Sequence, residues 1–236
     1  MPDRKTATAH SRSRPNKSIV NQRHTPWALI VTCALVVIFA GGVIGYAVSR
    51  SSSSSSGMAT NASDDPYKQP ALADAMKIKG VVYKQEPNHT HVSKPVIYDA
   101  SPPVGGDHSQ IWADCSGTVY PNAIANENAV HALEHGAVWI TYNPSLPADQ
   151  VATLRKLVDG QDRMLMSPYP DLDSAVSLQS WGYQLKVADA ADPRITQFID
   201  TLRYNSKTTP EYGAQCADPA FKAQPSTFGK PIFTLS

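Results

Sequence analysis

A long uncharged segment near the N-terminus constrains this chain more than any other feature. The run from Trp27 to Val48 is predominantly apolar and contains no Asp, Glu, Lys or Arg. A helix of this length can cross the hydrocarbon core of a bilayer, which is roughly 30 Å thick. Trp27 and Tyr46 lie near its two ends, where aromatic side chains favour the membrane interface. We therefore expect a transmembrane helix at residues 27–48.

The preceding residues, 1–26, form a basic tail. Asp3 is their one acidic residue, against Arg4, Lys5, Arg12, Arg14, Lys17 and Arg23. The positive-inside tendency places this tail in the cytoplasm and the chain after Arg50 outside the membrane. The alternative is a cleaved secretory signal, but the apolar run exceeds the usual core of about 7–15 residues and no small-residue cleavage pattern follows it. We expect an uncleaved signal-anchor and a single-pass protein of the cell membrane.

Composition indicates one globular part beyond the membrane. A run of serines, Ser51–Ser56, opens a flexible linker at residues 49–65, and residues 66–236 are then expected to form one extracytoplasmic domain. The formal net charge of +1, with basic residues concentrated in the tail, argues against a nucleic-acid partner. The composition does not exclude a protein partner in the cell envelope.

Hydrophobic periodicity in the domain predicts an α+β fold, or a small mixed α/β sheet. We expect helices at residues 70–78, 126–136, 147–158 and 192–202, the second capped by Asn126, and strands at 80–87, 95–98, 137–142, 163–167, 176–178 and 183–187. The strand–helix–strand order across residues 137–167 predicts a parallel pair with a right-handed crossover. Residues 87–117 and the Pro-rich C-terminal segment are expected to be irregular.

Two cysteines, Cys115 and Cys216, follow the membrane segment. Free thiols persist poorly outside the cytoplasm, so we expect a disulfide between them rather than two separate thiols. It would close a loop of about 100 residues and stabilise the domain by about 4–5 kcal/mol on the chain-entropy model.

Five of the seven histidines lie within one stretch of the domain. Residues two apart in an extended segment share a side, and residues four apart on a helix share a face, so the spacing predicts two chelating pairs. A fifth histidine follows a glycine turn. Two glutamates share the helix face with the second pair, which leaves Ala129, Val130 and Leu133 to face the core. These candidate ligands are His89, His91, His108, His131, His135, Glu127 and Glu134.

We expect at least three of these histidines to bind one metal ion, and a hydrogen-bonded structural network is the alternative. Imidazoles suit copper or zinc. Met164 and Met166 offer two thioethers on one face of a strand, which favours Cu(I), although an apolar strand that fills the core is the preferred interpretation of these methionines. Copper is thus marginally preferred over zinc. The function indicated is metal binding, in sequestration, delivery or envelope metal handling, rather than catalysis.

The helix pair also matches a catalytic pattern. His131, Glu134 and His135 fit H-x-x-E-H, in which two histidines bind zinc and the glutamate acts as a general base. A zinc-dependent hydrolase is therefore one alternative, and it requires a third ligand and an open coordination position. The other is a cell-envelope interaction domain without metal.

Four segments carry a resemblance to a known family. They are Tyr98–His108 (YDASPPVGGDH), Val130–Val138 (VHALEHGAV), Ser167–Pro170 (SPYP) and the pair Trp181–Gly182. Together they resemble the signature stretches of an actinobacterial, membrane-anchored family defined by a domain of unknown function, number 3105. The resemblance spans roughly residues 80–220. It implies an exported location but assigns no activity and no catalytic residues.

Overall fold

The structure is a computed structural model that describes residues 65–227. The predicted basic tail, the predicted transmembrane helix at 27–48 and residues 49–64 of the predicted linker lie outside this range. Among residues 65–227, no helix combines the length and apolar character needed to cross a membrane.

The described domain is built on one six-stranded mixed sheet, in agreement with the small α+β fold expected from the sequence. Its strand order is β1-β6-β5-β3-β4-β2. The central strand β3 pairs parallel with β4 and antiparallel with β5, and β4 pairs parallel with β2. The parallel β3–β4 pair confirms the prediction for residues 137–167. The strands are β1 (Val81–Tyr83), β2 (Ser116–Val119), β3 (Val138–Tyr142), β4 (Met164–Pro168), β5 (Val176–Ser180) and β6 (Tyr183–Val187).

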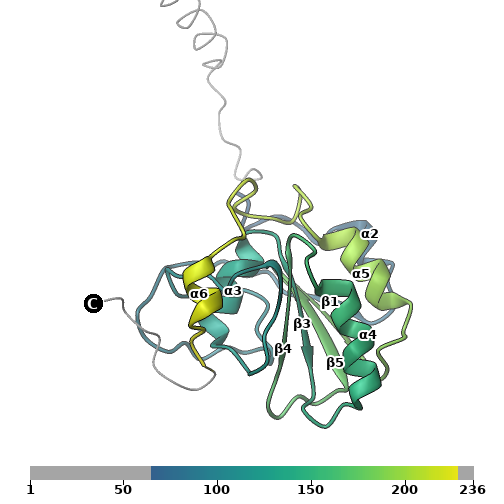
Figure 1. Cartoon of the computed structure of the whole chain (residues 1–236). Coiled ribbons are helices and arrows are strands. Elements are labelled where there is room, and N and C mark those ends of the chain that lie inside the picture. The colour runs from purple at the N-terminus through teal and green to yellow at the C-terminus, as the bar shows by residue number, and fades with distance from the viewer. Residues whose placement is uncertain (1–64, 228–236) are drawn as a thin grey trace, which may run out of the picture. The chain divides into compact units, whose positions relative to one another are not determined.

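Helices cover both faces of the sheet, as Figure 1 shows. One face carries α2 (Ala73–Met76), α4 (Ala148–Val158) and α5 (Arg194–Leu202), and the other carries α3 (Asn126–Glu134) and α6 (Pro219–Ala223). Alternation along a strand divides the core in two. Ile140 packs in the core under α4 and α5, whereas its neighbour Trp139 packs in the core under α3.

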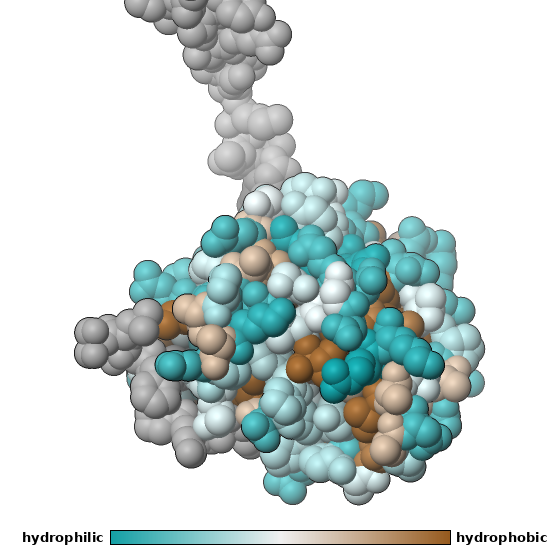
Figure 2. All heavy atoms as spheres, viewed as in Figure 1, coloured by the Kyte–Doolittle hydropathy of each residue, from teal (hydrophilic) through white to brown (hydrophobic). Residues whose placement is uncertain are grey.

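The face seen in Figure 2 is largely hydrophilic, with apolar side chains in small separate areas. Among residues 65–227, the large apolar side chains that remain exposed are Met76, Val82, Ile97 and Tyr212. They come from different segments of the chain, and exposed apolar residues are ordinary in a folded domain.

The structure corrects several local predictions. Residues 95–98 form no strand, because the Val96 amide donates to the side-chain Oε1 of Glu127 at 2.9 Å rather than to a neighbouring strand. Asn126 does not cap α3. It is the first helical residue, Ala125 is the N-cap, and the side-chain Nδ2 of Asn126 donates to the Tyr169 hydroxyl. Neither β2 nor α6 was predicted, since β2 has four residues and contains Gly117, and α6 has five residues in a Pro-rich segment.

Cys115 and Cys216 form the predicted disulfide, with Cα atoms 4.8 Å apart. The Cys115 amide also donates to the Cys216 carbonyl oxygen at 3.0 Å. The bond therefore ties the C-terminal segment to the start of β2.

Candidate metal centre

Helix α3 supplies the central side chains of the candidate site. Ala129, Val130 and Leu133 are fully buried in the core against the sheet, as predicted. His131 and Glu134 lie on the other arc of the helix, and His135 follows as the C-cap residue. Gly136 ends the helix with a φ of +87°, a left-handed conformation that glycine adopts at little cost.

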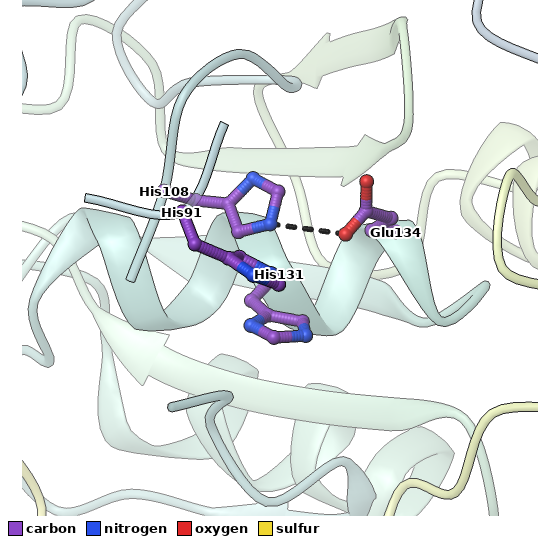
Figure 3. A group of neighbouring side chains, drawn as sticks. All are labelled: His91, His108, His131 and Glu134. Atoms are coloured by element: carbon purple, nitrogen blue, oxygen red, sulfur yellow. Dashed lines mark ion pairs between the residues drawn. The ribbon is translucent and has the colours of Figure 1, made fainter. Parts of the chain in front are cut away.

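The irregular segment before α3 brings two more histidines onto this arc. His91 and His108 pair in an isolated parallel bridge, in which the His108 amide donates to the Thr90 carbonyl at 3.0 Å and the Val92 amide donates to the His108 carbonyl at 2.7 Å. The ring centroids of His91 and His131 lie 4.9 Å apart, and those of His108 and His131 lie 4.8 Å apart. Figure 3 shows these three rings and Glu134 gathered beside α3.

The described residues form two overlapping groups of metal-ligand type. His91, His108, His131 and Glu134 each offer one ligand atom, and these atoms all lie within 4.8 Å of one another. His131, His135 and Glu211 form a second group by the same measure. We call them the four-residue set and the three-residue set. His131 belongs to both.

Hydrogen bonds behind two of the rings fix which nitrogen faces the site. Nδ1 of His108 contacts the Gly106 carbonyl oxygen at 2.8 Å, and Nδ1 of His131 contacts the Ser109 carbonyl oxygen at 2.6 Å. A carbonyl oxygen only accepts, so each Nδ1 carries a hydrogen, and a ring with no second hydrogen presents an Nε2 lone pair to the site. Metal-ligating histidines are oriented by bonds of this kind.

Nε2 of His108 points toward a carboxylate oxygen. Nε2 of His108 lies 3.0 Å from Oε2 of Glu134, both side chains are almost fully buried, and this Nε2 makes no hydrogen bond of acceptable geometry. A lone pair and a carboxylate at this separation repel each other unless a proton or a metal cation lies between them. The arrangement therefore fits a bound cation.

The histidines and glutamates of the site favour the charge states in which such side chains bind metals. Burial lowers the pKa of His131 to about 3 and that of His135 to about 4, so both rings are neutral at pH 7. Burial raises the pKa of the Glu134 carboxyl, but contacts with His108 and Tyr67 outweigh burial and hold it below its ordinary value. Burial and the neighbouring charge of Glu134 raise the pKa of Glu211. Two neighbouring carboxylates beside neutral imidazoles favour a cation.

Tyr67 braces the site from the start of the domain. Its hydroxyl donates to Oε1 of Glu134 at 2.7 Å, which leaves Oε2 facing His108. The Tyr67 ring stacks on the His89 imidazole with centroids 3.4 Å apart. His89 therefore packs against the brace and belongs to neither set.

The structure does not bring all the predicted ligands together. Five of them fall in the two sets: His91, His108, His131, His135 and Glu134. Glu127 instead accepts a hydrogen bond from the Val96 amide. Met164 and Met166 pack in the core under α4 and α5, on the face of the sheet opposite α3. The strand pattern identified their shared face correctly, but it did not indicate which face α3 would cover.

Three residues at the site were missed by sequence reasoning. Glu211 supplies a carboxylate to the three-residue set, and Tyr67 bonds Glu134. The Trp112 ring lies 5.6 Å from the His131 ring and 5.1 Å from the His135 ring. No local spacing marks Glu211 or Tyr67, because each reaches the site from a distant segment. Trp112 lies four residues after His108, in the segment already expected to carry ligands.

Comparison with known proteins agrees with the motif resemblance. No curated protein and no solved structure matches the chain. A family model described as "Protein of unknown function (DUF3105)" matches residues 89–218, which is more than half of the chain and includes every residue of both sets. The chain therefore belongs to this family of proteins of unknown function.

Proposed function

We propose that the domain binds a transition-metal ion, Cu(II) or Zn(II), through the four-residue set, and that the protein serves in metal sequestration or delivery. The observation that supports this most directly is the pairing of His108 Nε2 with Glu134 Oε2 at 3.0 Å. The carbonyl behind His108 places a hydrogen on Nδ1, so a proton or a metal cation is needed between Nε2 and the carboxylate, and we propose that it is the metal. His131 offers a second oriented lone pair beside them.

The ligand types narrow the choice of metal. Three imidazoles and a carboxylate suit Zn(II) and Cu(II). Thioethers would favour Cu(I), but both candidate methionines lie on the opposite face of the sheet. The proposal is therefore a divalent ion bound by nitrogen and oxygen.

Two histidines in one loop provide a matched test. In the full-length protein, purified without a histidine tag, His91→Ala removes a member of the four-residue set and His89→Ala removes a residue outside it. Loss of an outer-shell partner alone costs about 10–100-fold in affinity. We expect His91→Ala to weaken Cu(II) or Zn(II) binding by about 100-fold or more and His89→Ala to leave it within about threefold of wild type. Elemental analysis and titration calorimetry measure both.

A structural network without metal gives a different outcome. In that case His108 is doubly protonated and forms a buried ion pair with Glu134. The wild-type protein then binds neither ion in stoichiometric amount, or His91→Ala and His89→Ala change the affinity equally. Either result would refute the proposed function.

We also propose that the domain is held outside the cell membrane by residues 27–48. The uncharged apolar run and the basic residues before it support this topology. The disulfide supports an oxidising compartment. Protease added to intact cells should digest the domain and spare an epitope placed on the N-terminal tail, and protection of the domain would contradict the topology.

A zinc-dependent hydrolase is the second candidate, because Glu211 supplies the third ligand that the H-x-x-E-H pattern requires. In that arrangement Glu134 is a base and not a ligand. Glu134→Gln would then keep zinc and abolish hydrolysis of peptides or esters. In the proposed site Glu134 is a ligand, so the same variant should lose affinity instead.

A further inference from the structure

The two ligand sets meet at a residue that can serve one of them at a time. Nδ1 of His131 is engaged by the Ser109 carbonyl at 2.6 Å, which leaves Nε2 as its one free ligand atom. A single nitrogen lone pair binds one ion. The four-residue set and the three-residue set therefore cannot both be complete at the same moment.

Each set combines buried and accessible members. His108, His131 and Glu134 are almost fully buried, while His91, which completes the four-residue set, is exposed. In the three-residue set the His135 side chain is 4% exposed and the Glu211 side chain is 42% exposed. Nε2 of His135 lies 3.3 Å from Oε2 of Glu211, so these two ligand atoms already face each other. Water and an incoming ion can reach both sets.

From this geometry, and resting on the proposed function, we propose that the three-residue set is an exchange position for the metal held by the four-residue set. An ion first bound by His135 and Glu211 acquires His131. It then moves to His91, His108 and Glu134 while His131 stays bound, and it leaves by the reverse route. The ion keeps its charge throughout, and each ligand released is replaced by another, so no oxidant or reductant is needed.

This role makes a kinetic prediction that separates it from a permanent ligand role. An exchange residue lowers the barrier in both directions, so removing it slows loading and release equally and leaves the dissociation constant unchanged. A permanent ligand affects the dissociation constant. Cu(II) is a suitable probe because bound Cu(II) quenches tryptophan fluorescence, and two tryptophans border the site: Trp112 lies 5.1 Å from His135 and Trp181 lies 6.0 Å from His108, between ring centroids.

The experiment compares the full-length wild type with Glu211→Gln by stopped-flow fluorescence, first on mixing with Cu(II) and then on mixing the copper-loaded protein with excess EDTA. We expect Glu211→Gln to slow both loading and release by about tenfold, with a dissociation constant within about threefold of wild type. His135→Asn should behave in the same way. Asp99→Asn is the matched control, because it removes one negative charge from a side chain that is 84% exposed and belongs to neither set.

Several results would overturn the exchange role. Unchanged rates in Glu211→Gln, or a slowing that Asp99→Asn reproduces, would show that Glu211 acts at most through its charge. A weakening of more than about tenfold would make Glu211 a permanent ligand. Two tightly bound copper ions per chain would show that the sets fill independently. Failure of the wild type to bind copper or zinc would instead refute the proposed function itself.

Discussion

Each buried imidazole of the four-residue set is oriented by a carbonyl oxygen behind it. Gly106 provides this oxygen for His108 and Ser109 provides it for His131. Gly106 has a φ of +108°, a conformation that a side chain would strain. The glycines before His108 therefore do more than connect two segments: they allow the carbonyl to reach the ring that it orients.

At the same scale, Tyr67 positions Glu134. A substitution by phenylalanine removes the Tyr67 hydroxyl and keeps the ring. Tyr67→Phe deletes the 2.7 Å hydrogen bond to Oε1 of Glu134 and retains the stack on His89. We expect the affinity for Cu(II) or Zn(II) to fall by about tenfold, because outer-shell partners fix the orientation of the ligand. Titration calorimetry on the full-length protein measures the change.

Tyr120→Phe is the control for this substitution. The Tyr120 hydroxyl also makes a buried hydrogen bond, to the Asp114 carbonyl at 2.9 Å, but it touches no member of either set. Tyr120→Phe should lower the stability of the domain and leave the affinity for metal unchanged. Equal affinities for Tyr67→Phe and wild type would show that Glu134 needs no brace.

At the scale of elements, the sequence predicted those parts of the site that depend on local periodicity. Spacing along α3 placed His131 and Glu134 opposite Ala129, Val130 and Leu133, and the structure confirms this division. The other prediction from spacing, that His89 and His91 act together, is not seen. A strand would have put them on one side, but residues 89 and 90 are irregular and His89 turns to Tyr67. Which ring faces α3 depends on contacts far away in the sequence.

The strand β4 illustrates a further limit of periodicity. Alternation puts Met164 and Met166 together and Leu165 on the other face, but it does not say which face receives α3. The structure places Leu165 under α3 and the methionines under α4 and α5. That choice is made by packing of the whole core, which the local pattern does not contain.

This placement predicts that the two thioethers are irrelevant to metal binding. The double variant Met164→Leu, Met166→Leu nearly conserves core volume, so it should cost less than about 1.5 kcal/mol per site in free energy of unfolding. We expect its affinity for Cu(II) to equal that of wild type, as measured by the fluorescence titration. A loss of copper affinity in a variant of normal stability would bring the methionines back into the site.

At the scale of the whole molecule, the site depends on the closure of a long loop. Glu211 comes from the C-terminal segment, and its amide donates to the Glu134 carbonyl at 3.1 Å, which keeps it beside α3. The same segment is fixed by the disulfide and by the Trp112 indole, whose Nε1 donates to the Cys216 carbonyl at 3.2 Å. The sequence predicted the disulfide from the compartment, but it did not predict that the bond would hold a ligand-bearing segment against the helix.

Removing this disulfide should therefore reduce the stability of the domain. The cysteines are 101 residues apart, and a loop of that size contributes about 4–5 kcal/mol on the chain-entropy model. We expect Cys115→Ala, Cys216→Ala to lower the free energy of unfolding in urea by about this amount. Cys33→Ala, which removes the remaining cysteine, should have no such effect.

If the double variant does not fold, reductant added to the wild type gives the same comparison. A loss below about 1 kcal/mol would mean that packing of Phe221 and the hydrogen bond from the Asp218 amide to the Asp114 side chain hold the C-terminal segment without the disulfide.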